Sequence, residues 1–474
     1  MSSLSALDSL LSSSSSASSV DLSAILQAAT GASSPGIDVN AAVSSAVTAA
    51  EAPEQNWESQ QTTLQNRTTA LTSLQSGATN LDNDVQALNS LTGPLSATTV
   101  SSSDSGVVTG SAASGSAAGN NVVVVNSLST TASWSSSAVA SESATLPAES
   151  IIITAASGAT ATFATGGGVD TLTELANAIN SAGLGVTASV VEDATGYRLA
   201  ITSSIPGGGG NFTIVAPGSG LTFTQGATGS NASLTVNGIG YSSASNTVTG
   251  AIPGLTLNLQ SASPGTEVSV DVAPNTSQAS NAINQFVTDY NTLIGALNTQ
   301  FADTGSGQGA LADDPTVRNL QSELLGALDY TATPASGNSS TTVANLSSLG
   351  ISVNKDGSLS VNQSTLSSAL QNNFNDVQNF FQGSALNGFA NSLDQQLTSF
   401  VSPADGAFTV DLQSLSTENT GLQTDITNFQ NNVIAPLKTQ LQSEFSQAEI
   451  ALQQLPDEVR NVDAELGLNT SSNG

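Results

Sequence analysis

The sequence predicts an α+β protein in which both ends of the chain form an antiparallel helical coiled-coil stalk, with β-rich head domains inserted between them. Three observations lead to this prediction. A heptad pattern of apolar residues runs through residues 53–91, a second runs from about residue 411 to residue 455, and residues 100–275 are rich in short strand-like runs. Two seams of similar length at opposite ends of a chain pack most simply against each other.

The first long helix is expected over residues 53–91. Its seam starts with Trp57 and Leu64 and then becomes regular, with steps of three and four through Leu71, Leu74, Ala78, Leu81, Val85 and Leu88. This spacing places side chains on one face of a helix. The run "TGPL" at residues 92–95 ends the pattern, because Gly and Pro disfavour a continuing helix.

The second seam lies near the C-terminal end of the chain. It runs through Leu412, Leu415, Leu422, Ile426, Phe429 and Val433, with Asn419 among them, and then through Leu437, Leu441, Phe445, Ala448, Leu452 and Leu455. The step from Val433 to Leu437 is an extra step of four, a stutter that locally unwinds a left-handed supercoil. Pro436 lies at this step and Pro456 near the end, and either proline is able to kink or break the helix.

The middle of the chain is expected to form two head domains. Strand-like runs such as "NNVVVVNSL", "ESIIITAA" and "LTLNLQS" are bounded by Gly, Pro, Asn and Ser, which is typical of antiparallel sheets. One helix, "DTLTELANAIN", lies among them, with Asp170 or Thr171 as its cap. We assign the domains as follows: residues 106–145 with 230–274 form a β-rich head domain, residues 146–229 form an inserted α+β head domain, and residues 37–105 with 275–474 form the stalk.

Between the two seams the stalk is expected to contain further helices and one hairpin. Residues 277–301 place a row of apolar side chains on one helical face. Pro315 suits the first turn of a helix, and Asp314 before it is the expected cap. Residues 350–362, "GISVNKDGSLSVN", are typical of a hairpin that turns at Lys355-Asp356-Gly357.

The stretch "GIDVNAAVSSAVTAAEAP" (residues 36–53) predicts a short helix with small apolar side chains. Asp38 or Asn40 is its expected cap, and Val43 and Val47 fall on one side. The final proline interrupts the pattern, because the residue before a proline disfavours the helical region. An isolated helix of this length is marginal in water. We therefore expect this stripe to stay uncovered until another subunit packs on it.

The composition limits the possible partners. Of 474 residues only 9% are charged, against about 25% in ordinary soluble proteins. Lys and Arg number 6 and Asp and Glu 36, which gives a net charge of −30. Six cations cannot neutralise a nucleic acid backbone or an anionic membrane surface, so we expect no nucleic acid partner. No window of the sequence approaches the 18 or so apolar residues of a spanning helix, and we expect no membrane insertion.

The residues that carry most enzyme chemistry are absent. The chain has no Cys and no His, which excludes a disulfide framework, thiolate or imidazole metal sites, and catalytic triads. Asp313 and Asp314 are adjacent, so they lie on different sides of a helix rather than across a cleft. Trp57 and Trp134 are candidates for stacking on sugars, although Trp57 on a heptad seam fits a core position better. We expect no enzymatic activity and no cofactor.

The first 36 residues form a Ser/Ala-rich leader. A basic stretch followed by a long apolar stretch is missing, so the leader does not resemble a secretory signal peptide. We expect residues 1–36 to be mostly disordered, with a short helix at "DLSAILQAA".

The order of these motifs resembles a known family. "GIDVNAAVSSAVTAAEAPEQNWESQQTTLQNRTTALTSLQSGATNLDNDVQAL" resembles the N-terminal part of the flagellar filament cap protein, or hook-associated protein 2, family. "TLTELANAINSAGLGVTASVVEDATGYRLAITSS" resembles the repeat inserted in flagellins, hook-associated proteins and caps. "VNGIGYSSASNTVTGAIPGLTLNLQSASPGTEVSVDVAPNTSQASNAINQFVTDYNTLIGALN" resembles the start of the family's C-terminal half. The resemblance covers about residues 36–455.

The resemblance implies a structural function at the tip of the bacterial flagellar filament. Members of this family are exported through the flagellar type III apparatus and assemble as a small ring that guides flagellin into place. Implied partners are flagellin, other copies of the chain in a pentamer or hexamer, the hook–filament junction protein and an export chaperone. The candidate contact residues for a neighbouring subunit or flagellin are Ile37, Val39, Val43, Val47, Leu437, Leu441, Phe445 and Leu452. We expect Leu441, Phe445 and Leu452 to face either the first long helix or a neighbouring subunit.

Two alternatives remain open at this point. The chain is also compatible with another secreted structural or adhesive protein, such as a flagellar junction protein or a surface adhesin. A hydrolase is the third possibility, and the missing side chains argue against it.

Overall fold

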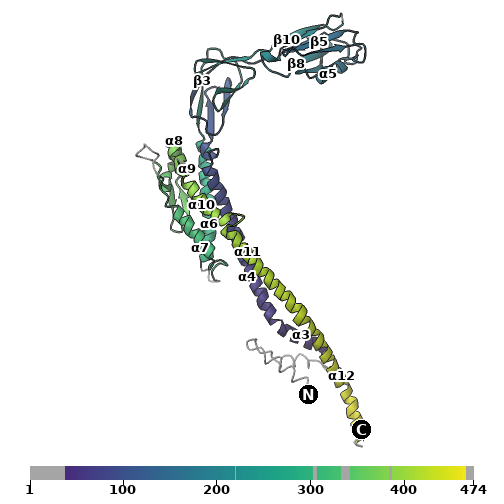
Figure 1. Cartoon of the computed structure of the whole chain (residues 1–474), viewed down its shortest axis with the longest axis vertical. Coiled ribbons are helices and arrows are strands. Elements are labelled where there is room, and N and C mark those ends of the chain that lie inside the picture. Colours follow the sequence, from purple (N-terminus) through teal and green to yellow (C-terminus); the bar gives the residue numbers. More distant parts are fainter. Residues whose placement is uncertain (1–37, 219, 303–306, 333–341, 384–386, 466–474) are drawn as a thin grey trace.

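The computed structural model describes residues 38–218, 220–302, 307–332, 342–383 and 387–465. The described part is elongated, with a long helical leg that carries two β-rich units, one beyond the other, at one end (Figure 1). The first and last described helices, α3 (Val39–Ala50) and α12 (Ala435–Glu465), lie together at the opposite end. The predicted α+β class is confirmed, with a helical stalk made from both ends of the chain and β-rich heads inserted between them.

The leg contains the helices that the periodic patterns predict, together with one helix over residues 389–401 that no pattern predicted. They are α3, α4 (Ala52–Asn89), α6 (Thr276–Phe301), α7 (Pro315–Ala327), α8 (Gln363–Asn372), α9 (Phe374–Gln382), α10 (Phe389–Val401), α11 (Ala407–Phe429) and α12, with short 3-10 turns η1 (Pro94–Ser96) and η3 (Leu346–Leu349). The predicted hairpin is present as β16 (Ile351–Val353) and β17 (Leu359–Val361). Glu51, the cap shared by α3 and α4, and Pro53 in the first turn of α4 separate the first two helices, as the proline predicted.

The first half of α4 pairs antiparallel with α11. Near the start of α4 the Trp57 ring packs edge-to-face on Phe429, with ring centroids 5.4 Å apart. Further along, Gln61 Nε2 donates to Gln423 Oε1 at 3.1 Å. Residue numbers therefore rise along one helix as they fall along the other. For this half of α4 the predicted pairing of the two seams is confirmed.

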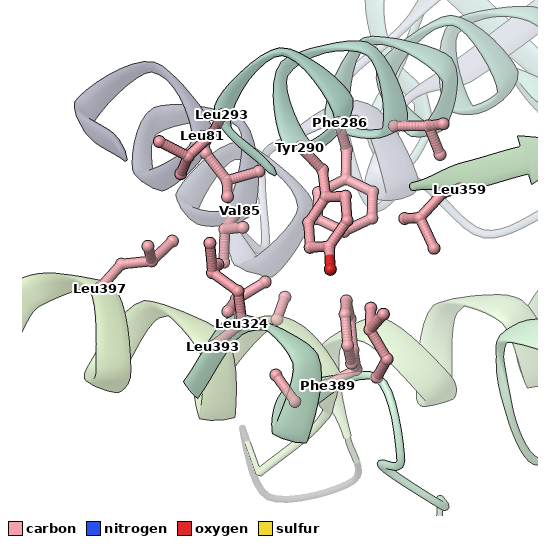
Figure 2. Close-up of a cluster of buried hydrophobic side chains, with 14 of the residues drawn as sticks. Leu81, Val85, Phe286, Tyr290, Leu293, Leu324, Leu359, Phe389, Leu393 and Leu397 are labelled. Carbon is pink, nitrogen blue, oxygen red and sulfur yellow. The ribbon is translucent and has the colours of Figure 1, made fainter. Parts of the chain in front are cut away.

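The second half of α4 packs on different helices. Its seam residues from Leu71 to Leu88 are buried in a core with α6 and α10 (Figure 2). In that core Phe286 and Tyr290 of α6 lie opposite Phe389 of α10, and the Phe286 and Phe389 rings meet at 5.7 Å. The expectation that the whole first seam meets the C-terminal seam is wrong here. Each buried aromatic or Leu contributes about 1.5–3 kcal/mol, so the buried α6 face stabilises this pairing.

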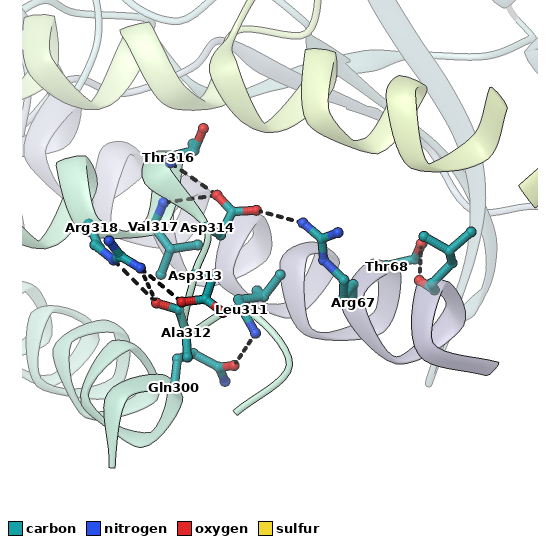
Figure 3. A network of polar contacts seen from close by, with 11 residues as sticks. Arg67, Thr68, Gln300, Leu311, Ala312, Asp313, Asp314, Thr316, Val317 and Arg318 are labelled. Atoms are coloured by element: carbon teal, nitrogen blue, oxygen red, sulfur yellow. Dashed lines mark hydrogen bonds and ion pairs between the residues drawn. The ribbon is translucent and has the colours of Figure 1, made fainter. Parts of the chain in front are cut away.

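A polar contact fixes α7 to α4. Asp314 caps α7 by accepting hydrogen bonds from the Thr316 and Val317 backbone N–H groups, as predicted. Its second oxygen accepts from Arg67 of α4 at 3.4 Å (Figure 3). Asp314 is buried, and the cap and the ion pair together satisfy its charge.

The first head unit is an antiparallel β structure. A five-stranded sheet has the order β1-β15-β3-β11-β12, and a three-stranded sheet has the order β13-β14-β2. The strands are β1 (Thr98–Ser102), β2 (Val108–Ala112), β3 (Gly119–Ser127), β11 (Ala232–Val236), β12 (Ile239–Ser243), β13 (Thr247–Ile252), β14 (Leu255–Leu259) and β15 (Val268–Pro274). Because β1 pairs with β15 along its whole length, residues 98–105 belong to the head. The expected stalk boundary at residue 105 is therefore wrong.

The inserted head unit has its own core. Its sheets have the orders β10-β4-β8-β7 and β6-β5-β9, and α5 (Leu172–Ser181) packs on them. The strands are β4 (Ser133–Ser136), β5 (Ser150–Ala155), β6 (Thr160–Ala164), β7 (Val186–Asp193), β8 (Gly196–Ser203), β9 (Phe212–Val215) and β10 (Phe223–Ala227), with a 3-10 turn η2 (Gly208–Gly210) before β9. Since β4 pairs with β8 and β10, residues 133–145 lie in this unit, and the expected boundary at residues 145/146 is wrong.

Local sequence signals explain the turns within the heads. Thr171 and Glu174 form a reciprocal capping box at the start of α5, so Thr171 rather than Asp170 is the cap. The hairpin between β11 and β12 turns at Asn237 and Gly238, both with positive φ, which Asn-Gly adopts at low cost. These short-range features position the strands before any long-range packing is considered.

Candidate assembly interface

The end of the leg is a small apolar cluster between α3 and α12. Asp38 caps α3 by accepting from the Ala41 N–H at 3.0 Å. Val43 and Val47 of α3 are buried against Ile434, which directly precedes α12, and Leu441 of α12. The stripe on α3 therefore has a partner within the same chain, and the expectation that it stays uncovered is wrong. Its partner lies at the other end of the sequence, so the surrounding residues gave no sign of it.

The remaining candidate contact residues differ in exposure. Val39, Leu437 and Phe445 are half-buried at the border of this cluster, and Leu452 beyond it is 42% exposed. Ile37 lies outside the described residues, as do residues 1–36, for which a leader was expected. Leu441 faces α3 and not α4, so the expected contact with the first long helix is wrong for this residue. The half-buried and exposed members are the ones available for a partner.

The helical hydrogen-bond pattern changes where the leg end joins the shaft. Residues Gln430–Ile434 form one π-helical turn (η4) between α11 and α12, and the Ala435 N–H donates to the Gln430 carbonyl. A π turn adds a residue and shifts the facing side chains. Ile434, only 4% exposed, takes the seam position, while Val433 is 46% exposed. The predicted stutter corresponds to this turn, and the assignment of Val433 to the seam is wrong.

The two prolines do not break the C-terminal helix. Pro436 directly follows the π turn, where the backbone hydrogen-bond pattern is already shifted, and the helix continues past it. Helix α12 then continues through residue 456 to Glu465. The helix that contains the C-terminal apolar seam therefore continues to the end of the described chain.

Glu54 connects the two helices at the π turn. Both of its carboxylate oxygens lie 2.6 Å from Gln430 Nε2, which donates to them, although the side chain is almost fully buried. The same level of the leg holds the contact between Trp57 and Phe429. The sequence reading gave no role to Glu54, because a single Glu among many polar residues carries no signal.

Two pairs of carboxyl groups lie further along α4, inside the leg. The Asp394 carboxyl of α10 lies beside Asp82, and burial together with that neighbour raises the pKa of Asp82 to about 6. The Asp289 carboxyl of α6 lies beside Asp84, and burial together with this neighbour raises the pKa of Asp84 to about 7. A hydrogen bond between two carboxyl groups needs a proton on one of them. The sequence reading did not find these pairs, because the partners lie on separate helices.

The described residues offer little for catalysis. None of them forms a group of three or more His, Cys, Asp or Glu side chains placed to hold a metal ion. No helix in the described ranges is both long and apolar enough to span a membrane. Trp134 is half-buried in the inserted head and donates its indole N–H to the Phe212 carbonyl at 3.1 Å.

Comparisons with protein families agree with this organisation. The flagellar hook-associated protein 2 N-terminus model matches residues 35–132, and the C-terminus model of the same family matches residues 229–457. The flagellin hook IN motif matches residues 150–204, within the inserted head. The two models of the hook-associated protein 2 family together cover more than half of the chain.

Individual relatives share sequence over part of their length. The chain is 27% identical over 246 residues to the B-type flagellar hook-associated protein 2 of Pseudomonas aeruginosa, which is 45% of this chain and 51% of the relative. It is 27% identical over 175 residues to the lateral flagellar hook-associated protein 2 of Vibrio parahaemolyticus, which is 36% of this chain and 37% of that protein. The match thus spans about half of the Pseudomonas relative and less of the Vibrio one.

A solved structure shares the fold. The D1-D2-D3 domains of the flagellar cap protein FliD from Escherichia coli superpose with a TM-score of 0.59 at 24% identity, covering 73% of this chain and 99% of that one. With both ends of the family matched in order and the intervening motif in place, this chain belongs to the flagellar hook-associated protein 2 family.

Proposed function

We propose that this protein is the structural cap at the distal end of a bacterial flagellar filament. In this role it promotes the polymerisation of flagellin subunits, prevents their loss, and is needed for filament elongation and motility. The proposal rests on membership of the hook-associated protein 2 family. The N-terminal family model matches residues 35–132, and the C-terminal model matches residues 229–457. The fold shared with the cap protein of Escherichia coli supports it.

The shape of the molecule suits this function. Heads at one end and a narrow leg at the other allow several copies to form a plate while the legs reach toward the filament (Figure 1). We propose that flagellin contacts the leg end through Val39, Leu437, Phe445 and Leu452, which are half-buried or exposed there. Proposed partners are other copies of the chain in a ring of five or six, the hook–filament junction protein and an export chaperone. We propose no cofactor and no enzymatic activity.

Export to the filament tip is the proposed route to this location. The chain contains no cysteine, so no disulfide has to be opened before the unfolded chain passes a narrow channel. The low content of charged side chains reduces the number of ion pairs that unfolding must break. These properties are compatible with the proposed secretion through the flagellar apparatus.

A deletion strain tests the proposal. Loss of the gene is expected to give short or absent filaments, with unpolymerised flagellin in the medium, and the intact gene should restore both filament length and swimming. A Leu452→Asp chain should restore less than a Gln453→Asp chain, which adds the same charge one position away. Full-length filaments and normal swimming in the deletion strain, with reduced attachment to surfaces, would instead identify an adhesin.

A further inference from the structure

The two head units are joined by two short connecting segments. One of them, residues 128–132, leads from β3 to β4, and the other, residues 228–231, leads from β10 back to β11. The two units lie one beyond the other and bury separate apolar cores (Figure 1). Units joined in this way are expected to move relative to each other unless their interface holds them. The polar contacts at the junction therefore determine whether the heads move.

The two connecting segments are bonded to each other. Thr130 and Ser230 form an antiparallel bridge, in which the Thr130 N–H donates to the Ser230 carbonyl at 2.9 Å. The Thr130 hydroxyl donates to the Thr228 carbonyl at 2.8 Å and accepts from the Ser230 N–H at 3.0 Å. The segments therefore cross the junction as a paired ribbon and not as two independent tethers.

One asparagine from each head unit holds one of the segments. In the first unit the Asn246 side chain accepts from the Ser129 N–H at 2.7 Å and donates to the Ser129 carbonyl at 3.1 Å. In the inserted unit the Asn211 side chain accepts from the Gly229 N–H at 2.8 Å and donates to the Gly229 carbonyl at 2.9 Å. An amide side chain has both a donor and an acceptor, so it can bond both backbone groups of one residue and fix the direction of the segment.

The two units also touch directly at Gly207. This residue has a φ of +78°, and a Cβ atom there would lie 2.6 Å from Asn231 Oδ1 and 2.8 Å from the Ala244 Cα of the first unit. The Gly207 N–H donates to the Thr130 carbonyl at 3.0 Å, and the Gly208 N–H donates to Asn231 Oδ1 at 2.8 Å. Glycine allows this approach because it has no side chain. The η2 turn of the inserted unit is therefore held against the first unit.

No charged side chain takes part in these contacts. Residues 105–141 contain no Asp, Glu, Lys or Arg, and neither do residues 199–266, so both sides of the junction are uncharged. Salt screens interactions between charged groups, and contacts between neutral groups should not depend on it. Repulsion between the two acidic head units would depend on salt. Salt therefore separates these two explanations of a fixed angle.

We propose that the junction is a rigid elbow, in which Asn211 and Asn246 are the positioning residues that hold the two head units at one angle. The name elbow covers the two connecting segments and the loops at residues 207–211 and 242–246. A fixed angle lets each copy present the same head surfaces to its neighbours, which a closed ring requires. This consequence for assembly rests on the proposed function, whereas the elbow itself is a property of the single chain.

Distances between spin labels test the elbow, because the chain has no cysteine of its own. Labels at Ser101→Cys on β1 and Ser189→Cys on β7, both exposed positions, report the distance between the two units. The labelled chain is diluted with unlabelled chain, so that only distances within one chain are measured. We expect one narrow distribution that is the same at low salt and at about 1 M NaCl, where the Debye length is about 3 Å. A broad or salt-dependent distribution would overturn the proposal.

Matched variants separate the elbow from the rest of the heads. Asn211→Ala with Asn246→Ala should widen the distribution about twofold or more, because the connecting segments are then free to act as a hinge. Asn120→Ala with Asn177→Ala makes the same changes at exposed positions outside the elbow and should leave the distribution unchanged. If the Asn211→Ala, Asn246→Ala chain keeps a distribution as narrow as that of the parent, these two residues do not hold the angle.

Two further measurements guard against unfolding of a head. A label pair within the inserted unit, Thr162→Cys with Ser189→Cys, should give a narrow distribution in every chain if the unit stays folded. Gly207→Ala provides an independent variant, because the added methyl group displaces Asn231 or Ala244. The distance between the units should then shift while the distance within the inserted unit does not. An unshifted distance between the units would contradict the direct contact at the elbow.

Filament length in the deletion strain tests the consequence for assembly. The Asn211→Ala, Asn246→Ala chain should restore shorter filaments than the Asn120→Ala, Asn177→Ala chain. Equal filament lengths would show that the elbow has no role in assembly. Full-length filaments in the deletion strain itself would instead count against the proposed function.

Discussion

The carboxyl pairs inside the leg should make its stability depend on pH. Asp82 is 6% exposed and receives a hydrogen bond from Gln86 at 2.8 Å on one oxygen, while its carboxyl also contacts Asp394. None of the ion pairs formed by described residues includes Asp82 or Asp394. Ionisation of Asp82 therefore adds a negative charge beside Asp394 with no compensating cation. The substitution Asp82→Asn replaces one carboxyl by a neutral group of the same shape that can still donate to Asp394.

The sign and size of the effect follow from the raised pKa. In the folded leg the pKa of Asp82 is raised from 3.8 to about 6, so the folded chain holds a proton that the unfolded chain releases. This contribution to stability is fully present below pH 4 and is lost as the pH rises through 6. The shift corresponds to about 3 kcal/mol at most, and solvent screening reduces it to about 1–2 kcal/mol. Asp82→Asn should therefore be more stable than the parent chain at pH 8 by about 1–2 kcal/mol and equal to it near pH 4.

Urea unfolding of the leg measures this difference. Trp57 lies on the leg, so its fluorescence reports leg unfolding once Trp134 in the head has been replaced by Phe in every chain compared. Asp425→Asn, a change of an exposed carboxylate on α11, serves as the control and should shift stability little at either pH. If Asp82→Asn keeps a constant difference from the parent between pH 4 and pH 8, or is less stable at pH 8, the two carboxyl groups do not share a proton.

Three further predictions concern the leg end, the heads and the α7 cap. Val43→Asp should release α3 from α12, seen as faster amide exchange in both helices, whereas Ser44→Asp on the exposed side should not; protection that persists in Val43→Asp would contradict the cluster. A fragment of residues 98–274 should show a cooperative thermal transition by circular dichroism, and a gradual loss of signal would contradict an independent head. Asp314→Ala should lower the free energy of leg unfolding in urea by about 1–2 kcal/mol, because the cap is lost. Arg67→Ala should lower it by less than about 1 kcal/mol, because the guanidinium is partly exposed. Equal losses for the two changes would mean that the ion pair outweighs the cap.

The pairing of α4 shows where sequence periodicity stops being informative. The heptad spacing from Leu71 to Leu88 correctly predicted one buried face. It did not predict what covers that face, because any apolar helix of the right length satisfies the same pattern. In the folded chain the first half of α4 meets α11, and the second half meets α6 and α10. The choice depends on how much apolar area each neighbour brings, which is a property of the assembled leg.

The apolar cluster at the leg end was also predicted in part by the sequence and decided in part by the tertiary structure. The sequence identified Val43, Val47 and Leu441 as apolar seam residues, and the structure brings these three together. It also assigned Val433 to the seam, whereas the π turn gives that position to Ile434. The periodicity showed the stutter at this place but did not show which neighbouring residue takes the seam position. Leu452 is exposed because α3 does not extend far enough along α12 to cover it. The heptad spacing of α12 contains no information on how far α3 extends.

The sequence by itself determined the features that are decided within a few residues. The cap at Asp314, the hairpin of β16 and β17, and the α+β order of elements depend on local hydrogen bonds and side-chain period. For the helices that begin at Val39 and Leu172 the sequence left two candidate caps each, and the structure selects Asp38 and Thr171. Only the tertiary structure decided which helices share a core, where the two head units divide, and which carboxyl groups become neighbours. Those features depend on contacts between residues far apart in the chain. Their free energy comes from area buried and charges brought together only after folding.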